Sequence, residues 1–255
     1  QFLSDHTQPV EPMVDSRSHW SSVHRSPHFQ LSPCKQEVTR SPAELSSDGV
    51  RAEVGVKSGL HIWEVMWSPT HRGSHAVIGV SRKDCPLQTS GYNVLVGGDS
   101  QSWGWELTTN QLWCYSDDAG LQPSTAPSTK AAETPLLIPE QVLLVLDADA
   151  GTLGYVVEGI YLGVAFKDLP CGVELFSAVS SVRGGASIGL RYLNGDPPAL
   201  MSLCGLSIHQ SLGQQRQDQK DKLPLPPFLQ CYLVLNIILI KSVYQGFFFF
   251  FLQPV

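Results

Sequence analysis

The best candidate for ion chemistry in this sequence is an acidic stretch, DADAGTLGYVVE, that begins at Asp147. Asp147, Asp149 and Glu158 occupy positions 1, 3 and 12 of a calcium loop, where carboxylates would hold the ion. Gly151 and Thr152, however, stand where that loop needs a ligand and a turn glycine, and the flanking residues are typical of strands. The stretch is therefore predicted to be a solvated hairpin turn.

The sequence contains none of the catalytic motifs that histidine, serine, cysteine and glycine-rich turns form in enzymes. The 8 histidines form no HExxH pair, and the chain has no GxSxG elbow, no phosphate-binding loop and no GxGxxG turn. The 6 cysteines form no CxxC pair. The number of cysteines alone would allow a disulfide framework. Reduced, mostly buried thiols are favoured, because a chain of this length can bury a hydrophobic core without disulfide cross-links. The sequence predicts a non-enzyme without metal or cofactor.

One cysteine stands in a helical pattern near the end of the chain. Leu200, Cys204 and Ile208 recur at a spacing of four residues after Asp196, a suitable N-cap, and before Gly213, a suitable stop. A helix of three turns is marginal alone, so its apolar stripe must be buried. The stripe can pack on the chain's own core or enter a groove of another protein, and the spacing by itself leaves both open.

The composition is that of a globular protein. The chain has 255 residues, 42% of them hydrophobic, and a formal net charge of −6. Its scattered Lys and Arg form no basic stripe, which argues against nucleic acid as the main partner. The first residues contain no apolar run of signal-peptide length, so a cytoplasmic location is expected.

The elements that must position any site are predicted to be strands. Aromatic and β-branched runs alternate with turn signals at intervals typical of an antiparallel sandwich. The predicted strands are residues 59–67, 74–82, 101–107 and 111–116, three strands within 141–166, and two more in the runs ELFSAVSSV and ASIGLRYLN. Residues 117–139, rich in Pro, Ser and Thr, are predicted to form a long surface loop, and residues 1–18 a disordered leader.

Several long runs resemble one family in order along the chain. The run SSDGVRAEVGVKSGLHIWEVMWSPTHRGSHAVIGVSRKDCPLQTSGYNVLVGGDSQSWGWEL is similar to the SPRY domain of the SPRY domain-containing SOCS box family, and so is LLVLDADAGTLGYVVEGIYLGVAF. The resemblance runs from about Trp20 to Leu233. It implies a mainly β fold, a SPRY-type antiparallel β-sandwich over residues 19–195, followed by a short helical SOCS box over residues 196–233. The stretch HWSSVHRSPHFQLSPCKQEV matches loosely, so irregular N-terminal strands are expected.

The SOCS-box resemblance implies ligase partners. Family members are substrate adaptors that connect a target to elongin B/C, cullin-5 and a RING-box protein, leading to ubiquitination and proteasomal degradation. Here the resemblance assigns elongin binding to Leu200, Leu203, Cys204 and Ile208, and cullin binding to Leu223, Pro224, Leu225 and Pro226. With the LPLP stretch at the expected distance, a partner groove is favoured over packing on the chain's own core for the Cys204 stripe.

The resemblance also implies a target-peptide site in the SPRY loops. The family binds an acidic residue, then Ile or Leu, then three Asn, a motif like that of inducible nitric oxide synthase. Position by position, the contacts fall on Arg40, Pro42, Gly73, Ser74, Tyr92, Leu95, Val182 and Gly184. Loop packing for Tyr92 and Leu95, and an ion pair for Arg40, are the alternatives. Glu44 and Arg183 stand where the family usually has alanine and tryptophan, which predicts a weakened or shifted preference.

The last segment, residues 234–255, departs from the family. Its apolar run up to residue 240 is too short to span a bilayer, and extending it to Leu252 crosses Lys241. An alternative transcript end is favoured over a membrane anchor, and the segment is expected to promote aggregation. Two rivals to the ligase adaptor remain: a SPRY binding module uncoupled from the ligase, and a membrane-tethered form of either.

Overall fold

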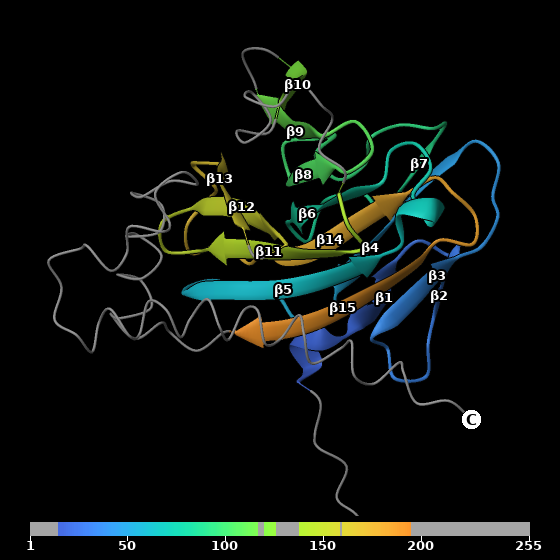
Figure 1. Ribbon diagram of the computed structural model, residues 1–255, viewed down its shortest axis with the longest axis horizontal. Coiled ribbons are helices and arrows are strands. Elements are labelled where there is room, and N and C mark those ends of the chain that lie inside the picture. The colour runs from blue at the N-terminus through green and yellow to red at the C-terminus, as the bar shows by residue number, and fades with distance from the viewer. Residues whose placement is uncertain (1–14, 117–119, 126–137, 159, 195–255) are drawn as a thin grey trace, which may run out of the picture.

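Two antiparallel sheets pack face to face in the computed structural model, which describes residues 15–116, 120–125, 138–158 and 160–194 (Figure 1). In sheet A the strand order is β1-β4-β14-β6-β8-β9-β10, and β7 also pairs with β4. In sheet B the order is β13-β12-β11-β5-β15-β3-β2. The predicted mainly β sandwich is confirmed.

The bounds of the strands follow. Sheet A consists of β1 (Trp20–Arg25), β4 (Ser46–Ala52), β6 (Val77–Ser81), β7 (Gln88–Ser90), β8 (Ser102–Glu106), β9 (Gln111–Ser116), β10 (Gly120–Thr125) and β14 (Phe176–Ser181). Sheet B consists of β2 (Phe29–Leu31), β3 (Glu37–Arg40), β5 (Leu60–Trp67), β11 (Gln141–Asp147), β12 (Thr152–Val157), β13 (Ile160–Phe166) and β15 (Ser187–Asn194). Two short 3₁₀ helices are η1 (Ser16–Ser18) and η2 (Pro69–His71).

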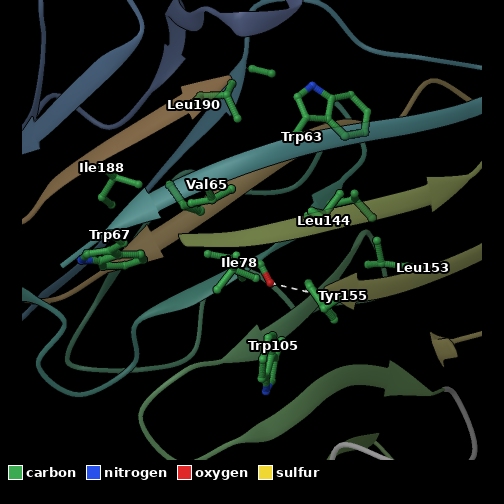
Figure 2. Packing of buried hydrophobic residues seen from close by; sticks show 14 of the residues in the cluster. Trp63, Val65, Trp67, Ile78, Trp105, Leu144, Leu153, Tyr155, Ile188 and Leu190 are labelled. Carbon is green, nitrogen blue, oxygen red and sulfur yellow. Dashed lines mark hydrogen bonds between the residues drawn. The ribbon is translucent and has the colours of Figure 1, made fainter. Parts of the chain in front are cut away.

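The main core lies between the sheets because alternate residues of each strand point inward. Trp63, Val65 and Trp67 of β5 are fully or almost fully buried, and Leu144 of the neighbouring β11 is buried with them (Figure 2). Each such side chain contributes about 1.5–3 kcal/mol on full burial. Tyr155 satisfies its buried hydroxyl by donating to the Ile78 carbonyl across the core at 3.1 Å, so this link joins the two sheets.

The prediction of a long surface loop over 117–139 is wrong in part. Residues 120–125 form β10, which pairs with β9 in full antiparallel register at the edge of sheet A. Pro123 is tolerated there because an edge strand need not donate on its outer side. The Pro- and Ser-rich composition that suggested a loop is therefore also compatible with an edge strand.

The predicted leader over residues 1–18 is also too long. Asp15 caps η1 by accepting from the backbone N–H of Arg17. The Arg17 carbonyl accepts from the Trp63 indole at 3.2 Å, and the Ser18 hydroxyl accepts from the Tyr192 backbone N–H at 2.9 Å. Residues 15–18 therefore belong to the sandwich. The expected irregularity of the N-terminal strands is confirmed by a register shift between β1 and β4.

The acidic stretch at Asp147 is the hairpin turn between β11 and β12, as predicted. One Asp147 carboxylate oxygen accepts from the backbone N–H groups of Asp149 and Ala150, which closes the turn locally. Within the ranges that the structure describes, no three His, Cys, Asp or Glu side chains gather as a metal site would require.

The four cysteines in the described ranges are not joined by disulfides. Of these, Cys85 is buried, Cys114 is half-buried, and Cys34 and Cys171 are exposed, so the expectation of mostly buried thiols is only partly met. Burial raises the pKa of the Cys85 thiol to about 11, which keeps this thiol protonated and unreactive at neutral pH.

Several predictions fall on residues outside the described ranges. These are the elongin-binding residues Leu200, Leu203, Cys204 and Ile208, the cullin-binding residues Leu223, Pro224, Leu225 and Pro226, and the tail 234–255. Among the described residues, no helix is both long and apolar enough to cross a membrane.

Candidate target-binding surface

Three connections between the sheets lie at the same end of the sandwich. They join β3 to β4, β5 to β6 and β14 to β15. Because β14 runs antiparallel to both β4 and β6, its last residues lie beside the first residues of these two strands. The loop that follows β7 reaches the same end, since β7 pairs with the start of β4. We call these four segments, residues 41–45, 72–76, 91–95 and 182–186, the loop end.

Close contacts connect the four segments. At Gly73, which has a φ of 66°, a Cβ would lie 2.9 Å from the Arg183 Cβ, so the two loops touch. At Gly184 a Cβ would lie 2.8 Å from the Pro42 Cα, so the β14–β15 loop also packs against the β3–β4 loop. The Gly91 N–H donates to the Leu45 carbonyl at 2.7 Å, which connects the segment 91–95 to the segment 41–45. Glycine suits Gly184 because the Pro42 backbone approaches too closely for a side chain, and it suits Gly73 because of the positive φ and the adjacent Arg183 side chain.

A buried ion pair supports the loop end from below. Arg40 and Asp48 are both fully buried, and an Arg40 guanidinium nitrogen lies 2.6 Å from the Asp48 carboxylate. The same guanidinium donates to the carbonyls of Ala43 and Ser46, at 3.2 and 2.9 Å. Arg40 therefore sets the path of residues 41–46 from the inside.

The Asp48 carboxylate accepts several further hydrogen bonds. The hydroxyls of Ser26 and Ser46 donate to one of its oxygens at 2.6 and 3.1 Å, and His28 lies 2.9 Å from the same oxygen. Burial by itself would raise the pKa of Asp48, but the hydrogen bonds from Ser26, Arg40 and His28 and the Arg40 charge hold that pKa below its ordinary value. The carboxylate is therefore ionised whenever the protein is folded at neutral pH.

A second buried carboxylate, Glu106, holds the loop between β5 and β6. It is 2% exposed and accepts from the His75 backbone N–H at 3.0 Å and from the Trp113 indole at 2.9 Å. His75 has a φ of 53°, an unfavourable value for a residue with a side chain. Thr108, two residues after Glu106, donates to the Gly73 carbonyl at 2.8 Å. Residues 73–75 are thus fastened to the hairpin of β8 and β9.

Two large apolar side chains are exposed above this buried polar framework. Leu45 is 68% exposed and Tyr92 is 48% exposed. Leu45 has a φ of 49°, and a leucine in this conformation is strained by about 1–3 kcal/mol. Strain together with exposure is typical of binding surfaces. The sequence did not identify Leu45, since no local pattern signals a left-handed leucine, nor did it identify Glu106.

Comparisons with known proteins agree with the β-sandwich fold and add a second module beyond the described residues. The family model of the SPRY domain matches residues 60–191, and the model of the SOCS box matches residues 196–233. The chain is 39% identical to human SPRY domain-containing SOCS box protein 1 over 230 residues, which are 89% of this chain and 83% of the relative. The chain belongs to the SPRY domain-containing SOCS box protein family.

Other relatives support the same assignment. Human SPRY domain-containing SOCS box protein 2 is 38% identical over 89% of this chain and 86% of its own length. Drosophila melanogaster Protein gustavus is 38% identical over 89% of this chain and 82% of its own length. The crystal structure of the SPRY domain of human HERC1 has a TM-score of 0.51 at 18% identity and covers 69% of this chain and 99% of that domain, which shows the shared fold.

The family assignment gives the chain its class of function. A SPRY domain followed by a SOCS box is the arrangement of a substrate adaptor of a cullin-RING ubiquitin ligase. Adaptors of this family are typically non-catalytic substrate receptors, and the SOCS box indicates elongin B/C and a cullin as partners in general.

The structure brings seven of the eight predicted target-binding residues, all except Arg40, to the loop end, but with unequal access. Pro42, Ser74, Tyr92 and Gly184 are exposed, and Gly73 and Val182 are half-buried. Leu95 is 4% exposed and packs near Gly49, where a Cβ would lie 3.2 Å from the Leu95 side chain.

Arg40 is the clearest departure from the expected arrangement. It was expected to offer its guanidinium to a ligand, with a surface ion pair as the alternative. Its ion pair with Asp48 is instead fully buried, and no part of the side chain is accessible. A charged side chain becomes buried when a carboxylate and carbonyls satisfy its donors, as they do here. Arg40 is therefore a positioning residue beneath the surface.

Proposed function

We propose that this SPRY domain-containing SOCS box protein recruits a target through its loop end for ubiquitination by an elongin B/C–cullin-5–RING-box ligase, leading to degradation by the proteasome. The observation that carries the target half is the exposure of Tyr92 and Leu45 at the loop end, where the buried Arg40–Asp48 pair holds residues 41–46. A rigid surface with exposed apolar side chains binds a short peptide at low entropic cost.

The proposed ligand is a short extended segment with an acidic residue, Ile or Leu, and three Asn. Asn amides need both donors and acceptors, and backbone groups near Gly73 and Gly184 would pair with them. Tyr92 supplies a ring and a hydroxyl. Glu44 and Arg183 are both exposed at this end, so they add one charge of each sign. We expect Glu44 to disfavour the acidic residue and so to weaken or shift the preference.

The ligase half of the proposal rests on residues outside the described ranges. In the SOCS box, Leu200, Leu203, Cys204 and Ile208 would enter the elongin groove, and Leu223, Pro224, Leu225 and Pro226 would select cullin-5. The prolines preorder an extended apolar strip, which lowers the entropic cost of binding. A cytoplasmic location is part of the proposal, and it is supported by the free thiols of the four described cysteines, Cys34, Cys85, Cys114 and Cys171.

Two experiments, a peptide titration and a co-purification, test the two halves of the proposal separately. Calorimetric titration of the full chain with an Asp-Ile-Asn-Asn-Asn peptide is expected to give saturable heat, which the Tyr92→Ala variant reduces. The matched control is Tyr115→Ala, which removes an exposed tyrosine from the distant β9. Absence of heat at high micromolar peptide would refute the motif. Failure of the chain to co-purify elongin B/C and cullin-5 would refute the ligase half.

A further inference from the structure

The four segments of the loop end follow one another in a fixed order across sheet A. At this end of the sheet β7, β4, β14 and β6 are neighbours, because β4 pairs with both β7 and β14, and β14 pairs with β6. The segments that adjoin these strands are, in the same order, residues 91–95, 41–45, 182–186 and 72–76. An extended peptide that runs across the strand ends therefore passes over all four segments in turn.

The two sides of this row differ in chemical character. On the β7 side, Leu45 and Tyr92 are exposed apolar side chains, and the hydrogen bond from Gly91 holds the backbone of Leu45 beside the segment of Tyr92. On the β6 side, Arg183 is exposed, and its Cβ, Cγ and Cδ atoms would lie 2.9, 3.5 and 3.3 Å from a Cβ at Gly73. The aliphatic part of Arg183 thus rests on Gly73. The loop end has an apolar flank, Leu45 and Tyr92, and a cationic flank, Arg183.

Arg183 carries the accessible guanidinium of the loop end. The only other Lys or Arg in the four segments is Arg72, which is 4% exposed and directs its donors to backbone carbonyls. Beneath the segments, Arg40 is neutralised by Asp48. Among the described residues no carboxylate forms an ion pair with Arg183. Its planar group of N–H donors can therefore bind a carboxylate of a ligand.

The exposed carboxylate of the loop end lies at the other flank. Glu44 is exposed next to Leu45, and no cation among the described residues pairs with it. An acidic residue of a ligand would meet this like charge at the apolar flank, but it would meet Arg183 at the cationic flank. Complementary charges of this kind fix the register in which a partner binds. The loop end therefore favours a ligand whose carboxylate is separated from its apolar residue.

The strand order gives the distance between the two flanks. Arg183 rests on the segment that enters β6, and Leu45 contacts the segment that leaves β7, so two to three strand spacings separate them. Neighbouring strands are about 4.8 Å apart, which gives about 10–15 Å between the flanks. An extended peptide advances about 3.3 Å per residue and covers this distance in three or four residues.

We propose that the target of this chain carries an acidic residue directly after the three Asn, and that Arg183 binds its carboxylate. This inference rests on the proposed function, in which Ile or Leu precedes three Asn. When the Ile or Leu packs on Leu45 and Tyr92, the Asn residues lie over the glycine backbones in the middle of the row. The fourth residue after the Ile or Leu then reaches Arg183. The acidic residue before the Ile lies near Glu44 and contributes little.

Calorimetric titration of the full chain with three peptides tests the proposal. Asp-Ile-Asn-Asn-Asn is extended by Glu, by Ala or by Lys, and the expected order of affinity is Glu, then Ala, then Lys. The Glu peptide should bind about threefold to fivefold more tightly than the Ala peptide, the range of an exposed ion pair. Arg183→Ala should remove this difference, and Arg183→Glu should reverse the order. High salt should reduce the difference in the unchanged protein, because it screens exposed charges.

Lys167→Ala is the matched control and should leave the order of affinity unchanged, because Lys167 is exposed behind β13 at the opposite end of the sandwich. Equal affinities of the three peptides for the unchanged protein would overturn this inference and leave the proposed function standing. A gain from Glu that persists in Arg183→Ala would assign the acidic residue to another cation and would also overturn it. Absence of heat with all three peptides would refute the motif and this inference together.

Discussion

The loop end and the outer face of sheet B, which points away from sheet A, arrange polar and apolar groups in opposite ways. Beneath the loop end a charged pair, Arg40 and Asp48, is fully buried, while Leu45 and Tyr92 are exposed on the loop end itself. On the outer face of sheet B apolar side chains such as Leu143 are hidden, although the described sandwich leaves this face without a second layer. A buried polar framework can keep apolar side chains exposed to solvent, where a transient partner can bind them. A hidden apolar face instead suits an interface that is never opened.

Breaking the buried pair is the largest perturbation we expect. Arg40→Ala leaves the Asp48 carboxylate buried without its charge partner, which costs about 3–5 kcal/mol of unfolding free energy. Peptide binding at the loop end is lost with it. Denaturant unfolding measures the first effect and calorimetry the second. Lys35→Ala, which breaks the exposed pair with Glu53, is the control and costs at most about 1 kcal/mol. Equal effects of both variants would show that Arg40 has no special role.

The next effect separates the two surfaces. Cys204→Asp places a charge in the proposed elongin-binding stripe and is expected to weaken elongin B/C binding by roughly 30-fold or more, the loss typical of an interface hot spot. Titration against purified elongin B/C measures it. The heat of peptide binding at the loop end stays unchanged, because the stripe is not part of that surface. Loss of both activities would show that the two surfaces are not independent.

A Glu106 variant tests whether a buried residue that only positions the loop end affects peptide binding. In Glu106→Gln the amide nitrogen replaces one carboxylate oxygen, so either the His75 N–H or the Trp113 indole N–H loses its acceptor. Loosening residues 73–75 is expected to weaken peptide binding about tenfold, equivalent to about 1.4 kcal/mol, while elongin binding is retained. Surface plasmon resonance with both ligands checks this. A uniform loss of both affinities would indicate global destabilisation instead of a positioning role.

Tyr92→Ala is expected to affect binding without affecting the fold. Its exposed side chain contributes little to stability, so the free energy of unfolding should change by no more than about 0.5 kcal/mol. The peptide affinity should fall up to about tenfold, which calorimetry measures. A marked drop in stability would show that Tyr92 is a packing residue, the alternative that the sequence left open.

The dependence of stability on pH gives the smallest effect. Because the pKa of Asp48 is lowered in the folded protein from an ordinary value of 3.8, its stabilising contribution is present above that value and is lost as the pH falls through the folded pKa. Thermal unfolding is therefore expected to show an acid-induced loss below about pH 4. Asp48→Asn should flatten this part of the profile. An unchanged profile would mean that other carboxylates dominate acid unfolding.

Local patterns predicted most strands correctly but not all. The run at 59–67 became β5 because its alternating aromatic and β-branched residues suit a buried strand, whichever neighbours it has. Residues 120–125 became β10 despite a loop-like composition, because pairing with β9 supplied the hydrogen bonds that composition cannot reveal. Residues 15–18 were similarly recruited through Trp63 and Tyr192, which lie far away in the sequence.

The residue types and their order determined by themselves that this chain is a β-sandwich joined to a SOCS box. They did so because strand periodicity is local and the family runs are contiguous. Only the tertiary structure decided that Arg40 supports the loop end from beneath, that Leu45 is exposed there in a strained conformation, and that Leu143 and Val156 share a hidden outer face. Burial and exposure depend on which distant strands pair and in which register, and such long-range pairing leaves no mark on neighbouring residues.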